Sequence, residues 1–268
     1  MDPQKISRDI RKRILAMHHK TNASHIGSSF SCVELLVSLY FSILHIRPEQ
    51  PDWPQRDRMI LSKGHAATAL YATLAARGFF PSQALENYYQ PGSTLLGHVT
   101  QGAVPGVEVS TGSLGHGLAL GAGMALAAKH DRQDQRVFVV MSDGECNEGS
   151  VWETVMFAVQ HKLDNLIAII DANRIQAYGA TRDIIDLDPL AEKFRAFGWT
   201  VKETDGHSHK DICGSLQDVP FERGRPSALV AHTVKGKGVS FMENQLAWHY
   251  RSPKHDEYEK AMRELDQT

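Results

Sequence analysis

Acidic and amide residues follow two buried apolar runs of this sequence, at the points where the runs end. The segment VFVVMSDG leads from apolar residues to Asp143, and LIAIIDAN leads to Asn173. If the two runs are neighbouring parallel strands, the carboxylate and the amide oxygen meet at one edge of a sheet. Hard oxygen ligands of this kind suit Mg²⁺, which keeps further positions for phosphate and water. An isolated Asp-Gly pair is more typical of a turn, so the interpretation depends on the pairing of the two strand ends.

The residues around Asp143 also suit an anion. A helix is expected to begin near Glu148 or Gly149, and the free N–H groups of its first turn favour a bound phosphate. Gly144 has no side chain, so a ligand can approach its backbone closely. Together with Asp143 and Asn173, these features predict a site for magnesium and a diphosphate.

Fourteen histidines are a high count for a chain of 268 residues. Five lie in glycine-rich or loop contexts: His25 in NASHIGSS, His65 in LSKGHA, His98 in LLGHVT, His116 in TGSLGHG and His249 in LAWHY. A lone histidine is usually structural. Several in separate loops can converge on one polar ligand, as donors to hydroxyl or phosphate oxygens. A zinc site is the weaker explanation, because no HExxH spacing occurs.

Composition excludes some classes of function. The formal net charge of −2 gives no reason to expect nucleic acid or an acidic membrane as partner. The three cysteines form no CxxC pair, so neither a zinc site nor a disulfide framework is expected. Neither a signal peptide nor an apolar run of about 18 residues is found, so we expect a soluble, cytoplasmic chain.

Apolar patterning predicts strands that alternate with helices. The expected strands are 59–61, 136–141, 166–171, 199–203 and 228–231. The expected helices are 6–17, 31–44 (opened by a capping box at 31–34), 66–77, 115–129, 149–161, 189–197 and 210–216. This order predicts an α/β fold whose parallel sheet is covered by helices on both faces. We expect one domain over residues 1–268, with short terminal extensions.

Five segments, in order, resemble those of the transketolase family. They are SHIGSSFSCVELL, LSKGHA, TGSLGHG, MSDGECNEG with IIDANRI after it, and TVKGKGVSFME. The Asp-Gly pair followed about 30 residues later by Asn173 is similar to the thiamine diphosphate motif. The resemblance extends from about Ile6 to Tyr250. It implies a thiamine diphosphate-binding fold that holds the cofactor with Mg²⁺, or with Ca²⁺ or Mn²⁺.

The resemblance also implies roles for individual residues. The metal ligands would be Asp143, Asn173 and the backbone oxygen of Ile175. Residues implied to bind the cofactor are His65, Gly112, Leu114, Gly144, Glu145, Asn173 and His249. Residues implied to act in catalysis are His25, His98 and His249, which would hold the ketose hydroxyls and help to move protons, and Glu148, which would link two active sites across a subunit interface.

The sequence departs from the family pattern at three positions and in length. Ser142 replaces the first glycine of the usual Gly-Asp-Gly, His116 stands where glutamine is usual, and Tyr250 stands where glycine is usual. Transketolases have three domains, and this chain ends where the first one ends. It therefore resembles the N-terminal subunit of a split transketolase, which transfers a two-carbon ketol unit between sugar phosphates. The implied partner is a C-terminal subunit carrying the pyrimidine-binding domain, in an assembly of two copies of each chain.

Three alternatives stay open. A deoxyxylulose-phosphate-synthase-like or other thiamine-dependent subunit shares the fold, although LSKGHA and TGSLG fit transketolase better. A nicotinamide dehydrogenase is suggested by the glycines from Gly112 to Gly121, but their spacing is not G-x-G-x-x-G and the segment before them is a poor strand. A non-catalytic cofactor-binding module would have no need of several histidines beside a diphosphate.

Overall fold

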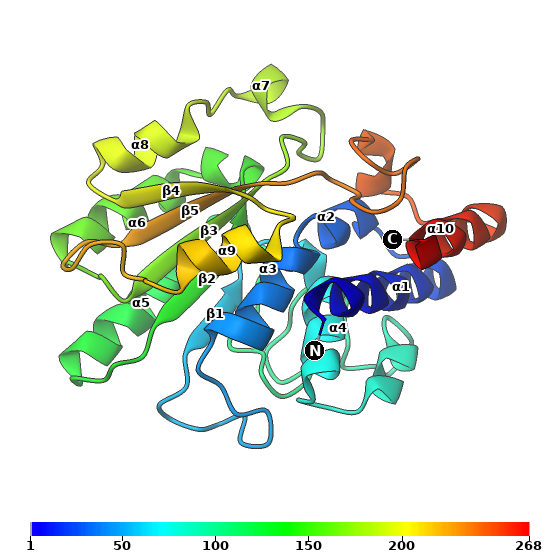
Figure 1. The fold of residues 1–268 in the computed structure, drawn as a ribbon, viewed down its shortest axis with the longest axis horizontal. Helices are drawn as coiled ribbons and strands as arrows, with labels where there is room; N and C mark the ends of the chain where they lie inside the picture. Colours follow the sequence, from blue (N-terminus) through cyan, green and yellow to red (C-terminus); the bar gives the residue numbers. More distant parts are fainter. Residues whose placement is uncertain (1, 268) are drawn as a thin grey trace.

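The computed structural model describes residues 2–267, and within them five parallel strands form one sheet (Figure 1). The strands are β1 (Arg58–Leu61), β2 (Val137–Ser142), β3 (Leu166–Ala172), β4 (Thr200–Asp205) and β5 (Ser227–His232). Their order across the sheet is β1-β2-β3-β5-β4. β2 and β3 are fully buried along their length, as expected for central strands covered on both faces.

Helices cover both faces of this sheet, and alternate strand residues serve the two cores. Phe138 and Val140 join the core that contains α1, α3, α4, α9 and α10, whereas Val137 and Val139 join the core that contains α5, α6 and α8. Helices of the first core are α1 (Pro3–Thr21), α2 (Ile26–Ser31), α3 (Val33–Ser38), α4 (Ala67–Arg77), α9 (His209–Leu216) and α10 (His255–Gln267). Helices of the second core are α5 (Gly117–His130), α6 (Gly149–Gln160) and α8 (Leu190–Ala196). The predicted fold class is confirmed.

Short elements complete the chain. α7 (Thr181–Ile184) is a single turn, and a π-helical turn spans Leu39–Ile43. The 3₁₀ turns are Gly64–Ala66, Ser82–Asn87, Gly144–Asn147 and Leu246–His249. Among residues 2–267, no helix is both long and apolar enough to cross a membrane.

The predicted capping box at 31–34 is wrong. Ser31 ends α2, and its hydroxyl lies 2.6 Å from Oδ2 of Asp171 and 3.0 Å from the backbone oxygen of Ser28, so its one hydrogen is directed to these tertiary and local acceptors. Glu34 is buried and accepts hydrogen bonds from Arg11 at 2.5 and 2.7 Å, and its Oε2 lies 2.9 Å from Nδ1 of His207. Both side chains that would form the box are therefore committed to tertiary partners, which outweigh a local cap.

The C-terminal segment is more than an extension. α10 lies beside α1 in Figure 1, and its Ala261 and Leu265 are buried in the same core as α1. The sheet order also brings β5 between β3 and β4, so strands adjacent in sequence are not all adjacent in space. Because all five strands are parallel, the segments that follow the carboxyl ends of β1, β2, β3 and β5 share one edge of the sheet.

Candidate active site

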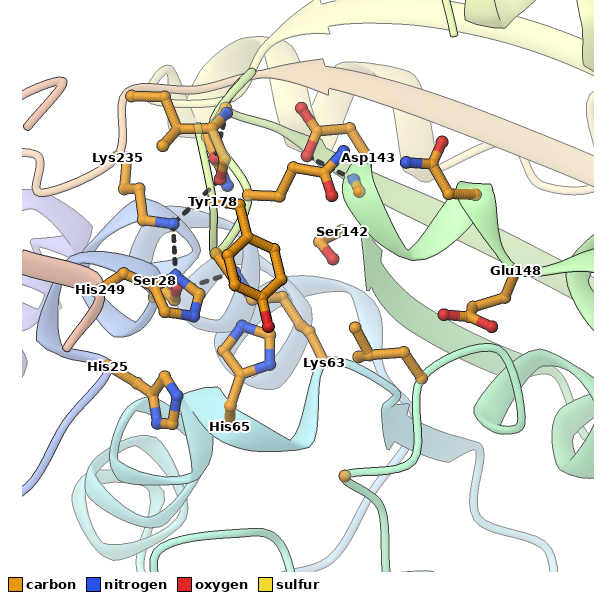
Figure 2. Close-up of a pocket in the computed structure, with 18 of the residues that line it drawn as sticks. His25, Ser28, Lys63, His65, Ser142, Asp143, Glu148, Tyr178, Lys235 and His249 are labelled. Carbon is orange, nitrogen blue, oxygen red and sulfur yellow. Dashed lines mark hydrogen bonds between the residues drawn. The ribbon is translucent and has the colours of Figure 1, made fainter. Parts of the chain in front are cut away.

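One cavity of about 360 Å³ lies at the carboxyl edge of the sheet (Figure 2). Eleven of the residues predicted from the sequence line it: His25, His65, His98, Gly112, Leu114, Asp143, Gly144, Glu148, Asn173, Ile175 and His249. They come from segments that follow β1, β2, β3 and β5, from the start of α2, and from the loop before α5. A concave site built from the ends of several strands is where this fold class binds ligands.

Asp143 and Asn173 meet as the strand argument requires. β2 and β3 are neighbours, with Ser142 opposite Asp171 in the register. Oδ1 of Asp143 accepts a hydrogen bond from the backbone N–H of Gly144 at 2.7 Å. Oδ2 accepts one from the backbone N–H of Arg174 at 2.5 Å. Burial and the nearby Asp171 raise the pKa of Asp143 to about 6. A divalent cation beside this carboxylate would reverse that shift.

A metal here would rest on mixed oxygen ligands. Within residues 2–267, no group of three His, Cys, Asp or Glu side chains could hold a metal ion. The available oxygens are the Asp143 carboxylate, the Asn173 amide and the Ile175 carbonyl, beside one another in the cavity wall. The Asn173 amide is already oriented, because its Nδ2 donates to Asp171 at 3.3 Å. This set fits Mg²⁺, which commonly takes few protein oxygens and completes its shell with phosphate and water.

Two described residues of the cavity wall have an unpartnered buried amide atom, and one of these atoms is a donor that could serve an anion. In the described part of the chain, Nε2 of Gln176 and Oδ1 of Asn147 are buried without a hydrogen-bond partner, and both residues line the cavity. A buried amide donor is costly unless it meets an acceptor such as a phosphate oxygen. A Cβ at Gly144 would lie 3.1 Å from Cβ of Gln176, so glycine lets these two segments of the cavity wall pack closely.

Glu145, which the family resemblance implies as a cofactor-binding residue, has its side chain outside the cavity. Its side chain is fully buried and lies outside the cavity wall. It accepts hydrogen bonds from the Ser62 hydroxyl, from the backbone N–H of Gly115 at 2.9 Å and from that of Ser142 at 3.3 Å. Burial raises its pKa. Glu145 therefore joins the segments that surround the cavity instead of touching a ligand through its side chain.

Two buried lysines in the cavity wall were missed by the sequence reasoning. Lys63 forms an ion pair with Asp171 and donates to the backbone oxygen of Ser28 at 2.9 Å. Lys235 donates to the backbone oxygen of Ile175 at 2.9 Å. Burial and the charge of Lys63 lower the pKa of Lys235 to about 8, so it is mostly an ammonium at neutral pH. Both lysines closely follow strand ends, so the rule that found Asp143 would have found them if applied to β1 and β5.

Four histidines converge on the side of the cavity away from Asp143. The ring of His25 lies 5.2 Å from that of His65, 5.8 Å from that of His98 and 5.0 Å from that of His249, between centroids. Burial, and then neighbouring positive groups, lower the pKa of His25 to about 4 and of His249 to about 3, and hold the pKa of His65 well below 6.5. These three rings are therefore neutral at pH 7, and each can both donate and accept a proton.

His25 is held in an unusual backbone conformation. Its φ is +80° at the residue before α2, a left-handed geometry that costs free energy for a residue with a Cβ. Its backbone N–H donates to the backbone oxygen of His249 at 2.8 Å. This bond ties the segment before α2 to the segment after β5, and sets two imidazoles side by side.

Comparison with known proteins identifies the family. The family model described as "Transketolase, thiamine diphosphate binding domain" matches residues 4–266. The chain belongs to the transketolase family. Its fold also matches solved transketolases: it superposes on the enzyme from Leishmania mexicana with a TM-score of 0.93 at 26% identity, covering 99% of this chain and 41% of that one. For the Campylobacter jejuni transketolase the TM-score is 0.92 at 29% identity, with 99% and 43% covered.

Similar curated transketolases include single subunits. The chain is 44% identical over 257 residues to one subunit of the apulose-4-phosphate transketolase of Phocaeicola vulgatus, covering 96% of this chain and 91% of that protein. It is 41% identical over 266 residues to one subunit of the 6-deoxy-6-sulfo-D-fructose transketolase of Clostridium sp. (strain MSTE9), covering 99% and 97%. Against the longer human transketolase it spans 38% of the length, at 38% identity. The chain thus corresponds to the N-terminal, thiamine diphosphate-binding part of a transketolase.

The structure places the three departures from the transketolase pattern differently. Ser142 lines the cavity at the end of β2. His116 is exposed at the start of α5, outside the cavity wall. Tyr250 is 53% exposed, and its ring lies edge-on to that of His249 with 4.7 Å between centroids. Tyr250 therefore contacts the histidine cluster, whereas His116 does not line the cavity.

Proposed function

We propose that this chain is the cofactor-binding subunit of a two-component transketolase, and that it transfers a two-carbon ketol unit from a ketose to an aldose together with a partner subunit. The carrying observation is the cavity itself, where a predicted metal site, a phosphate-suited wall and four histidines meet. Similarity to single transketolase subunits over nearly the whole chain supports the two-component organisation. Those relatives are named for different ketoses, one a sugar phosphate and the other a sulfonated sugar, so neither the sugar nor its anionic group is assigned for this chain.

In this proposal Asp143, Asn173 and the carbonyl of Ile175 hold a divalent metal, with Mg²⁺ the expected ion. The backbone N–H of Gly144, His65 and the free amide of Gln176 face the diphosphate. Bound thiamine diphosphate would supply a nucleophilic thiazolium carbon and the means to stabilise a carbanion. The chain's contribution is to neutralise the diphosphate, fix its position and exclude water from the inner wall.

The histidines serve the ketose. His25, His98 and His249 lie together on the side of the cavity away from Asp143. Since His25 and His249 are neutral at pH 7, each ring can hydrogen-bond a ketose hydroxyl: His25 can accept a proton at its unprotonated nitrogen, whereas His249, whose Nδ1 lies 2.9 Å from Nζ of Lys235, is expected to donate. A cluster of rings from separate loops can orient several hydroxyls of one sugar, which lowers the entropic cost of reaching the reactive geometry.

The partner is expected at the mouth of the cavity. Glu148 is exposed there at the start of α6, and Met156 and Phe157 of the same helix are 51% and 40% exposed. Exposed apolar side chains of this size are typical of a subunit interface. We place a C-terminal subunit with the pyrimidine-binding domain against this mouth, in an assembly of two copies of each chain.

The proposed location is the cytoplasm. The thiols of Cys32, Cys146 and Cys213 are unpaired, which is compatible with a reducing compartment.

Cofactor binding by the isolated chain tests the proposal. Isothermal titration with thiamine diphosphate and Mg²⁺ should show binding by the wild-type chain, and Asp143→Ala should weaken it by roughly 100-fold or more, since even indirect partners of a metal contribute about 10–100-fold. Asn173→Ala should weaken it in the same direction. The matched control is Asp183→Ala, an exposed carboxylate on α7. Wild-type affinity in Asp143→Ala would contradict the metal site.

A further inference from the structure

Lys235 connects two groups that serve different parts of the proposed reaction. Its Nζ atom lies 2.9 Å from the backbone oxygen of Ile175 and 2.9 Å from Nδ1 of His249, as the dashed lines in Figure 2 show. Ile175 belongs to the proposed metal site, and His249 belongs to the histidine cluster. The lysine is 1% exposed, so water does not readily replace either acceptor.

The contact with Lys235 selects one tautomer of His249. An ammonium group has three donors and no acceptor, so Nδ1 of the neutral ring must accept its hydrogen bond. The ring hydrogen then lies on Nε2, and His249 faces other groups with Nε2–H as a donor. Without Lys235, nothing in this contact would favour one ring nitrogen over the other.

The carbonyl of Ile175 cannot serve Lys235 and a divalent cation equally well. A metal ion on that oxygen would place two cations a few ångströms apart, where they repel each other. Filling the metal site would therefore displace Nζ from Ile175. Because the same Nζ atom holds His249, its displacement would change the hydrogen bond at Nδ1.

We propose that Lys235 is a positioning residue that couples occupancy of the metal site to the tautomer and orientation of His249. This inference rests on the proposed metal site. It assigns Lys235 a role besides attraction of the diphosphate: a metal ion on the Ile175 carbonyl would compete with the lysine for that oxygen, and the displaced lysine would alter its hydrogen bond to His249.

Metal binding without cofactor gives the first test. Mn²⁺ is titrated into the isolated chain and followed by electron paramagnetic resonance. Lys235→Met should bind Mn²⁺ about tenfold or more tightly than wild type, because a competing cation is removed. The control is Lys237→Met, two residues away in the same loop, whose ammonium faces Glu243; it should match wild type. Equal or weaker binding by Lys235→Met would overturn the coupling.

The imidazole of His249 gives the second test. Nitrogen-15 spectra of the histidine-labelled chain are recorded before and after addition of Mg²⁺ with pyrophosphate, and His249→Gln assigns the signal. In wild type and Lys237→Met, His249 should begin as the Nε2–H tautomer and shift on addition. In Lys235→Met it should begin as a mixture of tautomers and respond little. An equal response in Lys235→Met, or none in saturated wild type, overturns the proposal.

The outcomes separate this inference from the function beneath it. If Mn²⁺ fails to bind wild type, or binds Asp143→Ala equally well, the proposed metal site fails and the coupling fails with it. If Mn²⁺ binds through Asp143 but His249 does not respond, the coupling alone is wrong. Should Lys235→Met not fold, Lys235→Gln keeps a hydrogen-bonding amide without the charge, and it too should tighten Mn²⁺ binding.

Discussion

The side chains that line this cavity have different proposed roles according to where they lie. Asp143 and Asn173 lie at the ends of β2 and β3, and the histidine rings gather beyond them. His65 follows β1 near Lys63, whereas His98 belongs to the loop before α5. The family resemblance implies different tasks for these histidines, with His65 at the cofactor and His25 and His98 at the ketose.

Separate substitution of the histidines tests that division. His25→Ala and His98→Ala should bind thiamine diphosphate with near wild-type affinity, but should lower turnover of the complete enzyme by about 10²- to 10⁴-fold, through lost orientation and proton transfer. His65→Ala should instead weaken cofactor binding. Titration calorimetry on the isolated chain separates the two groups. Identical binding behaviour in all three variants would contradict the assignment.

Segments around the cavity are joined by Glu145, a residue that the sequence had suggested as a ligand. Its carboxyl connects Ser62 after β1, Gly115 before α5 and Ser142 at the end of β2. Glu145→Ala should lower the free energy of unfolding by about 2–4 kcal/mol, because buried donors lose their acceptor. Chemical denaturation measures this loss. Glu145→Gln keeps one acceptor oxygen and should cost less; equal stability of the alanine variant and wild type would refute the bracing role.

A second buried carboxylate joins helices to the loop that carries Lys235. Glu34 of α3 pairs with Arg11 of α1, and it contacts His207, whose Nε2 accepts from the backbone N–H of Val234 at 2.8 Å. Burial raises the pKa of Glu34, but the charge and hydrogen bonds of Arg11, together with His207, outweigh it and hold that pKa well below 4.5.

The depressed pKa of Glu34 predicts acid sensitivity. A carboxyl whose folded pKa lies below its unfolded value stabilises the fold above about pH 4.5, and this contribution is lost as the pH falls below that value. Glu34→Gln should therefore reduce stability at pH 7 and flatten the loss of stability between about pH 5 and 3. Denaturation series at several pH values measure it, with the exposed Glu153→Gln of α6 as control. An acid limb as steep as that of wild type would argue against the Glu34 contribution.

Local pattern and tertiary contact explain which elements were predictable. β2 and β3 are long apolar runs, so their positions and the meeting of Asp143 with Asn173 followed from the sequence. The insertion of β5 between β3 and β4 did not, because strand order depends on crossovers between distant segments. The capping box failed because Arg11 and Asp171, far away in sequence, take its side chains. Lys235 closely follows the end of β5, so its position near the site was open to the strand-end rule, but its burial was not, because burial of an ammonium depends on oxygens that only the fold brings near it.

Across the whole molecule, the described residues form one side of an active site. They provide one sheet and, at the edge that carries the proposed metal ligands, a cavity lined by most of the predicted site residues. The wall of that cavity includes Tyr178, which is 84% exposed, and Ile185 at the end of the following α7 is 59% exposed. The chain spans about two fifths of the full-length transketolases it matches. The family resemblance implies that the aminopyrimidine of the cofactor is held by a different domain from a second chain.

This chain alone should therefore not catalyse ketol transfer. The resemblance implies that a glutamate of the partner protonates the aminopyrimidine and so allows the thiazolium carbon to lose its proton. Glu145 cannot substitute because it is buried under the cavity, and Glu148 follows the metal-binding strand at the diphosphate end. The purified chain supplied with thiamine diphosphate, Mg²⁺, ketose donors and aldose acceptors should stay inactive, and activity should appear when the partner is added.

The family resemblance implies that Glu148 lies near a subunit interface of the assembled enzyme, where it would link two active sites. Glu148 is exposed beside the cavity at the start of α6, so Glu148→Ala should leave the thermal stability of the isolated chain nearly unchanged. It should instead weaken assembly with the partner, measured by sedimentation of the mixture, and activity should fall with the assembled fraction. For the prediction that this chain is inactive alone, the decisive measurement is turnover by the purified wild-type chain without its partner. Ketol transfer at an ordinary enzymatic rate, on the order of 1 per second or faster, would show that one chain suffices.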